Sequence, residues 1–310
     1  MGEHGERGEH CRIFNSCSAR LHVFESREQY WARRSATLTV VTAPPAVVLS
    51  IAGFDPSSGA GVTADLKTIA AHGLFGISCI TALTVQSTQG VAQVQPVPGE
   101  LVRSTLEVLL KDFQPDAVKI GMLGSKEVVE AVASILEKQT LANVVFDPAL
   151  KASSGAVLLE AEAIRSLIER LVPLVQVITP NLEEAQRLTG RPVSSLPEMR
   201  AAARQLHKLG AKAVVVTGGH LEQPTDILSQ ESGERIVDFV GEHVSTNSTH
   251  GTGCAFASAI ACNLALGKSL EESVRNAKSY VSQALRLAYQ VGKGKGPINH
   301  LFRLEREKDC

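Results

Sequence analysis

Short apolar runs alternate with longer amphipathic stretches along most of this chain. Runs such as 46–51 and 144–146 are rich in Val, Ile and Leu, which is typical of strands buried on both faces of a sheet. Between such runs apolar residues recur at helical spacing, as Val62, Leu66 and Ile69 do. This alternation predicts an α/β fold, with a mostly parallel central sheet and helices on both faces.

The predicted elements cover the chain from residue 46 almost to its end. We expect strands at 46–51, 77–85, 91–94, 117–120, 144–146, 175–178, 213–217, 225–229 and 235–240. We expect helices at 62–70, 100–111, 126–137, 161–171, on both sides of Pro192, at 253–266 and at 270–288. No repeat interrupts this region, so 44–305 is predicted to be one domain with a tail at 306–310. Residues 1–43 mix Glu, Arg and His without any period, and we expect a poorly ordered extension there.

Composition excludes several classes of protein. With 310 residues, 44% of them hydrophobic, the chain can form a large core, and its net charge of −1 gives no reason to expect nucleic acid or an anionic membrane as partner. No apolar run reaches the roughly 18 residues of a membrane span. The six cysteines show no C-x-x-C spacing. We therefore expect a cytoplasmic protein with reduced thiols.

Polar and glycine-rich segments follow the predicted strands repeatedly. They lie at 53–61, 84–90, 121–125, 147–155, 179–184 and 217–220. Ligands of such sheets bind beyond the carboxyl ends of the strands, so we expect a site at this edge. The phosphate-binding loop of P-loop enzymes, the dinucleotide fingerprint and the hydrolase nucleophile elbow are all absent from the sequence.

Two of the candidate segments suit phosphoryl transfer. Segment 248–254 holds two glycines and Cys254 before an apolar helix, which predicts an anion cradle at a helix N-terminus, with the thiol pointing into it. Asn181 and Glu184, with Asp147 after another strand, offer hard oxygen ligands for Mg²⁺. The alternatives are a glycine loop packed for close approach, an ordinary capping box and a turn aspartate.

A set of motifs occurs in one order along the chain. They are G-F-D-P-S-S-G-A-G at 53–61, T-A-L-T-V-Q-S-T at 81–88, K-I-G-M-L at 119–123, T-P-N-L-E-E at 179–184, H-G-T-G-C at 250–254 and G-K-G-K-G-P-I-N-H at 292–300. Together they closely resemble the hydroxymethylpyrimidine/phosphomethylpyrimidine kinases of thiamine biosynthesis, in the ribokinase-like superfamily. The resemblance covers residues 46–302.

This resemblance implies a function and a set of site residues. The expected enzyme transfers phosphate from ATP, with Mg²⁺, to 4-amino-5-hydroxymethyl-2-methylpyrimidine and then to its monophosphate, and it acts as a homodimer. The pyrimidine pocket would contain Gln86, whose amide can donate and accept side by side, with Gly53, Asp65, Thr84 and Met122. The phosphoryl anion hole would comprise Gly251, Thr252 and Gly253, with Cys254 as a base whose pKa the helix N-terminus lowers. The nucleotide and Mg²⁺ would be held by Asp147, Asn181, Glu184, Thr217, Gly219 and Lys278, the metal by Glu184 and Asp147.

One position departs from the family pattern. Thr217 stands where the family often has a lysine before Gly-Gly-His, and threonine cannot neutralise phosphate charge. Lys278 or Lys293 could compensate. Three alternatives remain at this point: a pyridoxal kinase of the same superfamily, a pyrimidine-binding module that has lost transfer, and a thiol hydrolase using Cys254 with His250.

Overall fold

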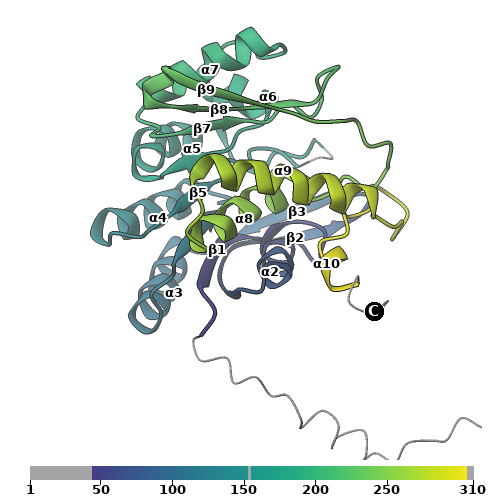
Figure 1. The fold of residues 1–310 in the computed structure, drawn as a ribbon. Helices are drawn as coiled ribbons and strands as arrows, with labels where there is room; N and C mark the ends of the chain where they lie inside the picture. The colour runs from purple at the N-terminus through teal and green to yellow at the C-terminus, as the bar shows by residue number, and fades with distance from the viewer. Residues whose placement is uncertain (1–43, 153–154, 306–310) are drawn as a thin grey trace, which may run out of the picture. The chain divides into compact units, whose positions relative to one another are not determined.

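One nine-stranded sheet organises the computed structural model, which describes residues 44–152 and 155–305. The expected extension at 1–43 and the tail at 306–310 lie outside the described residues. The strand order across the sheet (Figure 1) is β3 (Gly90–Pro96), β2 (Phe75–Ser87), β1 (Val47–Phe54), β4 (Ala117–Ile120), β5 (Val144–Phe146), β6 (Val177–Ile178), β7 (Val214–Val216), β8 (Thr225–Gln230) and β9 (Arg235–Val240). All neighbours from β2 to β7 pair in parallel, and only β3–β2, β7–β8 and β8–β9 are antiparallel. The predicted mostly parallel sheet is confirmed.

Helices cover both faces because alternate strand residues point in opposite directions. Val48, Val145 and Val177 belong to a buried cluster with α2 (Gly61–Ala71), α8 (Thr252–Ala265), α9 (Leu270–Arg286) and α10 (Phe302–Glu305). Their neighbours Leu49 and Ile178 belong to a second cluster, which takes in α3 (Gly99–Asp112), α4 (Lys126–Lys138), α5 (Ala161–Ser166), α6 (Leu182–Thr189) and α7 (Leu196–Lys208). Strands apolar on both faces therefore dictate the three-layered arrangement seen in Figure 1.

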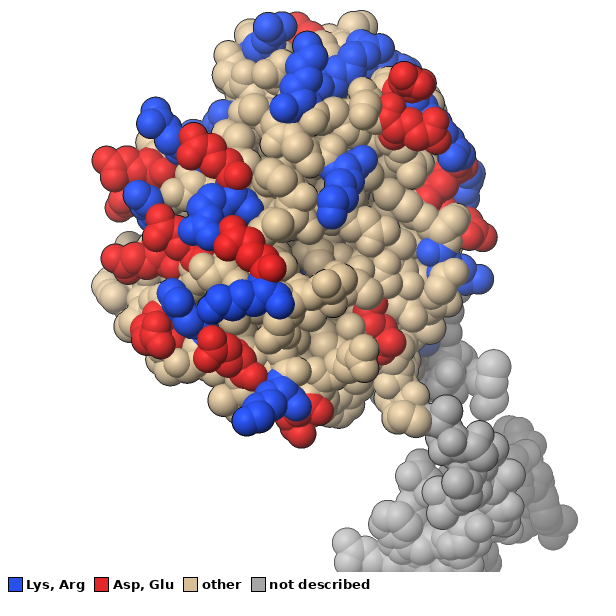
Figure 2. Space-filling model, turned by 90° about the vertical axis from the view of Figure 1, so that its left-hand side faces the viewer, with Lys and Arg blue, Asp and Glu red and all other residues tan. Residues whose placement is uncertain are grey.

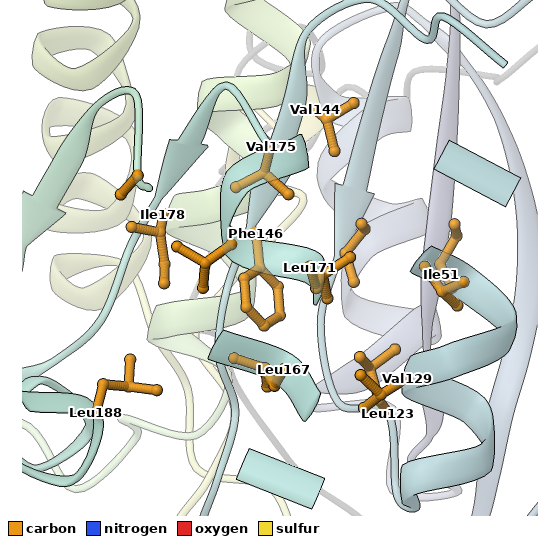
Figure 3. Packing of buried hydrophobic residues seen from close by; sticks show 14 of the residues in the cluster. Ile51, Leu123, Val129, Val144, Phe146, Leu167, Leu171, Val175, Ile178 and Leu188 are labelled. Atoms are coloured by element: carbon orange, nitrogen blue, oxygen red, sulfur yellow. The ribbon is translucent and has the colours of Figure 1, made fainter. Parts of the chain in front are cut away.

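The core fixes the strand ends from which the site is built. Phe146, the last residue of β5, is completely buried and packs among Leu167, Leu171 and Ile178 (Figure 3). Each such side chain contributes roughly 1.5–3 kcal/mol when it leaves water. The residue after Phe146 is Asp147, so this packing anchors a carboxylate at the carboxyl edge of the sheet.

Several element boundaries differ from the sequence prediction, most clearly those of one helix and of β2. The helix expected at 161–171 is α-helical only to Ser166 and continues as a π-helical turn (Leu167–Leu171) and a 3₁₀ turn (Val172–Leu174). Pro173 lies in that last turn and cannot continue the helical hydrogen-bond ladder. β2 extends on both sides of the predicted strand, because its first residue, Phe75, pairs with Val47 of β1 and its last residues pair with β3.

Within 44–152 and 155–305, no helix combines the length and the apolar character needed to cross a bilayer. On the face in Figure 2, basic and acidic side chains are interspersed, so no field of a single sign covers that face.

Candidate active site

The candidate site residues gather at the carboxyl edge of the sheet, as their positions after the strands predict. β1 ends next to Gly53, β2 carries Thr84 and Gln86, and Asp147 directly follows β5. The N-terminus of α8 reaches the same edge, because a Cβ at Gly253 would lie 4.0 Å from both carboxylate oxygens of Asp147. Segments far apart in the sequence thus face one space.

A hydrogen-bond network joins the Gln86 end of the site to the loop before α8. His250 Nε2 lies 2.8 Å from Asp55 Oδ2 and 3.2 Å from the Gln86 amide, and Thr84 Oγ1 lies 3.1 Å from the other end of that amide. Ionised Asp55 is only an acceptor, so His250 Nε2–H donates to it. The amide nitrogen of Gln86 is the end that lies 3.2 Å from His250 Nε2, and Thr84 Oγ1–H donates to the amide oxygen. Both ends of the Gln86 amide are therefore in contact with side chains of the site.

Asp55 and His250 belong to the quoted motifs, but sequence reasoning gave neither a binding role. Asp55 also accepts from the backbone N–H groups of Ser57 and Ala60, which shapes the loop after β1. Burial alone would raise the pKa of Asp55, but hydrogen bonds from His250 and Ser57 outweigh burial and lower it. The pair is separated by 195 residues, and no local pattern could reveal it.

The Gln86 end opens into a cavity of about 470 Å³, which Gln86, Thr88, Ala152 and His250 help to line. This size suits a small ligand. Close by, Met122 packs against Ala82 and Leu158 in a small apolar cluster. A Cβ at Gly53 would lie 2.9 Å from Met122 Sδ, so glycine is what lets β1 approach this side chain. The apolar cluster and the Gln86 amide belong to the same edge of the sheet, and such a combination suits a heteroaromatic ring with hydrogen-bonding edges.

The N-terminus of α8 has the geometry of an anion cradle. Gly251 has a φ of 85°, and a Cβ there would lie 1.8 Å from the carbonyl oxygen of Gly59, so only glycine fits. In the described part of the chain, the backbone N–H groups of Gly253 and Cys254 have no hydrogen-bond acceptor. No acidic residue lies in the first turn of α8 to compete with a bound anion. Unpaired donors at the positive end of a helix favour negative charge there.

Cys254 corrects one prediction. Burial of the thiol, with the negative charges of Asp147 and Asp65 nearby, raises its pKa to about 12, although Lys119 acts in the opposite direction. The lowered pKa expected from the helix N-terminus is therefore wrong. The backbone N–H of Gly61 acts to lower the pKa of the thiol, and the thiol acts to lower that of Asp147. His250 contacts Asp55 and Gln86, and this gives no support to a Cys254–His250 dyad.

Asp65 lies beneath the pocket and is completely buried. Its carboxylate accepts hydrogen bonds from Lys119 Nζ at 2.9 Å, Ser50 Oγ at 2.6 Å and Ser258 Oγ at 2.8 Å. Lys119 Nζ also lies 3.9 Å from Asp147 Oδ2. This placement indicates a supporting role for Asp65, which holds a buried cation next to the phosphoryl end of the site. Sequence reasoning gave Lys119 no role, although it lies in the K-I-G-M-L motif.

Asp147, Asn181 and Glu184 form the acidic part of the site. The capping box weighed as an alternative is present: Glu184 N–H donates to Asn181 Oδ1 at 3.0 Å, and Asn181 N–H donates to Glu184 Oε2 at 2.9 Å. Burial and the charge of Asp147 raise the pKa of Glu184 to about 8, and burial raises that of Asp147. Two buried carboxylates whose pKa values are both raised fit a divalent cation, which would stabilise their ionised forms.

Few side chains of the candidate site could bind a metal ion. No group of three or more His, Cys, Asp or Glu side chains within 44–152 and 155–305 could hold a metal ion. Mg²⁺ is commonly bound through one or two carboxylates together with water and substrate phosphates. The Asp147–Glu184 pair suits a site of this kind, and it does not suit a site in which the protein supplies every ligand.

Thr217, Gly219 and Lys278 lie near the end of β7. Thr217 N–H donates to Pro180 O at 2.9 Å, and no atom lies within 4 Å of the position of a Cβ at Gly219, so the backbone there is open. Lys278 Nζ lies 2.7 Å from Asp226 Oδ2, whose other oxygen accepts the N–H of Gly218 at 3.0 Å. Asp226, which the sequence did not single out, thus already neutralises Lys278.

Comparison with known proteins places these motifs in one family. The family model described as phosphomethylpyrimidine kinase matches residues 55–299. The thiamine biosynthesis bifunctional protein of Geobacter sulfurreducens is 44% identical over 86% of this chain, which spans only 54% of that protein. The hydroxymethylpyrimidine/phosphomethylpyrimidine kinase of Haemophilus influenzae is 40% identical, with 82% of this chain and 96% of that protein covered.

Solved structures agree on the fold. The pyridoxal kinase of Bacillus subtilis in complex with ADP superposes with a TM-score of 0.76 at 34% identity, covering 83% of this chain and 97% of the other. The phosphomethylpyrimidine kinase of Clostridium difficile superposes with a TM-score of 0.69 at 36% identity, covering 77% and 99%. The predicted ribokinase-like fold class is confirmed by this likeness to kinases of the same architecture.

Proposed function

The chain belongs to the phosphomethylpyrimidine kinase family, and from this membership we propose that it uses ATP to phosphorylate 4-amino-5-hydroxymethyl-2-methylpyrimidine and then the monophosphate, in thiamine biosynthesis. One observation carries the proposal. The His250 side chain contacts the Gln86 amide, while the next residue, Gly251, begins the anion cradle. The loop of His250 and Gly251 therefore connects the amide that would bind the heterocycle with the cradle that would bind the phosphoryl group.

The residues of this chain supply positioning and charge. Gln86 would orient the aminopyrimidine against Met122 so that its hydroxymethyl oxygen faces the N-terminus of α8. The oxygen–phosphorus bond to that group forms as the bond from the γ-phosphorus to ADP breaks, and the N–H groups of Gly253 and Cys254 stabilise the charge on the moving phosphoryl. A divalent cation held by Asp147 and Glu184 would neutralise phosphate charge when bound.

Cys254 is the proposed acceptor of the hydroxyl proton. A neutral thiol cannot accept this proton, so Cys254 would act as the thiolate, after its own proton has passed to the neighbouring carboxylate of Asp147, and the nearby ammonium of Lys119 is the group that favours the ionised form. In a loose transition state the hydroxyl proton leaves late. The backbone N–H groups of the cradle therefore contribute more to the rate enhancement than the base does. Thr217, Gly219 and Asn181 lie where the nucleotide would bind, on the β6 and β7 side of the cradle.

A pyridoxal kinase is the second candidate, because the Bacillus subtilis pyridoxal kinase superposes well on this chain. Both alcohols are heteroaromatic and would face the same cradle. The Gln86 amide favours the aminopyrimidine, whose adjacent ring nitrogen and amino group match an acceptor and a donor side by side. A module that binds the pyrimidine without transfer is the third candidate, motivated by Thr217.

We also propose that the protein is a cytoplasmic homodimer. Leu83 and Val85 are 50% and 60% exposed, while Thr84 and Gln86 on the same strand point to the site. A second copy covering that outer face would hide both apolar side chains. Cys79, Cys254 and Cys262 are free thiols, which supports a reducing compartment. Sedimentation at micromolar concentration would test the dimer, and Leu83→Glu should shift it towards monomer.

A coupled assay of ADP release tests the proposed reaction. The pyrimidine alcohol, its monophosphate and pyridoxal are supplied separately with ATP and Mg²⁺. We expect turnover with both pyrimidines and much less with pyridoxal. A clear preference for pyridoxal would favour the second candidate, and tight pyrimidine binding without ADP release would favour the binding module.

A further inference from the structure

Two loops of the candidate site dock against each other through paired glycine contacts. One loop follows β1 at residues 55–60, and the other precedes α8 at residues 248–251. A Cβ at Gly59 would collide with the ring of His250, and a Cβ at Gly251 would collide with the carbonyl oxygen of Gly59. The two backbones are therefore in direct contact at the entrance of the anion cradle.

The carboxylate of Asp55 joins these two loops. Its Oδ2 accepts hydrogen bonds from His250 Nε2 at 2.8 Å and from the backbone N–H of Ala60 at 2.9 Å. Its Oδ1 accepts from the backbone N–H and the hydroxyl group of Ser57, at 2.8 and 2.7 Å. Asp55 is 3% exposed, so these bonds are shielded from bulk water. Both oxygens face donors only, an arrangement that an ionised carboxylate satisfies and an amide cannot.

The backbone of His250 is fixed by the C-terminal segment. His250 N–H donates to Gly296 O at 3.0 Å, and Ile298 N–H donates to His250 O at 3.3 Å. His250 is thus held through its backbone by that segment and through its side chain by Asp55. The next residue, Gly251, is the N-cap of α8, so the position of His250 determines where the unpaired N–H groups of the cradle point.

We propose that Asp55 is a positioning residue for phosphoryl transfer, which acts through His250 to hold the anion cradle in place relative to the Gln86 amide. This inference rests on the proposed function. Backbone donors stabilise a moving phosphoryl group when they are already aimed at it, and a misplacement of about 1 Å can cost about 100-fold in rate. In this role Asp55 contacts no reacting atom, so its loss should lower kcat more than it weakens the binding of either substrate.

The test is a double-mutant cycle between Asp55 and His250. Asp55→Asn keeps the shape of the side chain but turns an N–H group towards one pair of its donors. His250→Leu removes the ring donor, and His250→Gln retains an N–H donor for Asp55. Asp116→Asn is the matched control, because Asp116 also accepts a backbone N–H, that of Val47, at the edge where β1 begins.

The assay measures kcat and the KM values for the pyrimidine alcohol and for ATP. Chemical denaturation verifies that each variant is folded at the assay temperature. We expect Asp55→Asn to lower kcat about 10- to 100-fold with little change in either KM, and Asp116→Asn to leave kcat unchanged. His250→Leu should lose a similar factor in kcat, and His250→Gln should recover most of it.

The double variant Asp55→Asn/His250→Leu should lose no more kcat than Asp55→Asn alone, because both changes break the same link. Wild-type kcat in Asp55→Asn, losses that multiply in the double variant, or a His250→Gln protein as slow as His250→Leu would each overturn the proposal. If Asp55→Asn does not fold, the comparison of His250→Leu with His250→Gln decides.

The proposed substrate and this role of Asp55 can fail separately. If the wild-type protein phosphorylates pyridoxal and not the pyrimidine, the proposed function is wrong, and the same cycle run with pyridoxal decides on Asp55. If neither alcohol is phosphorylated, inorganic phosphate is titrated into the protein, and the amide NMR signal of Gly253 reports its binding at the cradle. Weaker phosphate binding in Asp55→Asn than in the wild type and in Asp116→Asn supports the proposal, and equal binding overturns it.

Discussion

The ammonium nitrogen of Lys119 lies 2.9 Å from each carboxylate oxygen of Asp65, and both side chains are completely buried. The hydroxyl groups of Ser50 and Ser258 complete the shell of the carboxylate. Because the same ammonium is 3.9 Å from Asp147, a fixed positive charge lies at the phosphoryl end of the site. The Lys119–Asp65 pair therefore affects both the stability of the core and the electrostatic potential at the anion cradle.

Lys119→Met should destabilise the fold, because it leaves the Asp65 carboxylate buried without its cation. Breaking one side of a buried ion pair costs about 3–5 kcal/mol. Chemical denaturation of the variant measures this cost. The double variant Lys119→Met/Asp65→Asn should recover much of the loss, since the orphaned charge is then absent. A single variant as stable as the wild type would show that the pair does not hold the site together.

Gln86→Ala should weaken binding of the pyrimidine and leave binding of ATP as it was. The substitution removes the amide that Thr84 and His250 hold in place, at a distance from the acidic end of the site. Loss of a hydrogen-bonding partner for a buried ligand edge costs roughly 1–3 kcal/mol, which corresponds to about 5–150-fold in KM for the alcohol. Gln95→Ala on β3 is the control, since Gln95 is exposed. Equal KM values for wild type and Gln86→Ala would remove Gln86 from the pocket.

Cys254→Ala should lower kcat by about 100-fold or more, as the loss of a group that takes a proton does, with little change in the KM for ATP. Cys262→Ala, in the same helix and fully buried, serves as control for the loss of a thiol from α8. Single-turnover measurements separate the chemical step from product release. Turnover of Cys254→Ala at the wild-type rate would assign the chemistry to the backbone N–H groups alone.

The sequence indicated those parts of the candidate site that depend on local chemistry. The glycines of the cradle, the Asn181–Glu184 pair and Gln86 lie in short motifs whose backbone requirements are local. The residue pairs that set the charges and pKa values of the site are far apart in the sequence, as Lys119 and Asp65 are, at a separation of 54 residues. The pKa of Cys254 shows the same limit. A helix N-terminus lowers a thiol pKa, and only the fold reveals that burial and two carboxylates outweigh that effect.

His300 should make the protein sensitive to acid. It is 3% exposed, and burial, with the charges of Lys67 and His250 nearby, lowers its pKa from 6.5 to about 4. The unfolded chain therefore binds a proton between pH 6.5 and 4 that the folded chain excludes. Stability is complete above pH 6.5 and falls as the pH drops to 4, by on the order of 3 kcal/mol. His72 shifts in the same direction.

Denaturant unfolding at several pH values checks this sign. His300→Gln should flatten the loss of stability between pH 6.5 and 4, and His220→Gln, at an exposed position, should leave it unchanged. A His300→Gln protein whose stability falls with acid as steeply as that of the wild type would show that His300 is not the titrating group.

The most direct test of the central claim is a competition between the two alcohols. Equimolar 4-amino-5-hydroxymethyl-2-methylpyrimidine and pyridoxal are incubated together with the protein, ATP and Mg²⁺, and the phosphorylated products are quantified by mass spectrometry. Because the Gln86 amide and the cradle at α8 are matched to the aminopyrimidine, its phosphates should dominate the products. A mixture dominated by pyridoxal phosphate, or one without any phosphorylated product, would contradict the account.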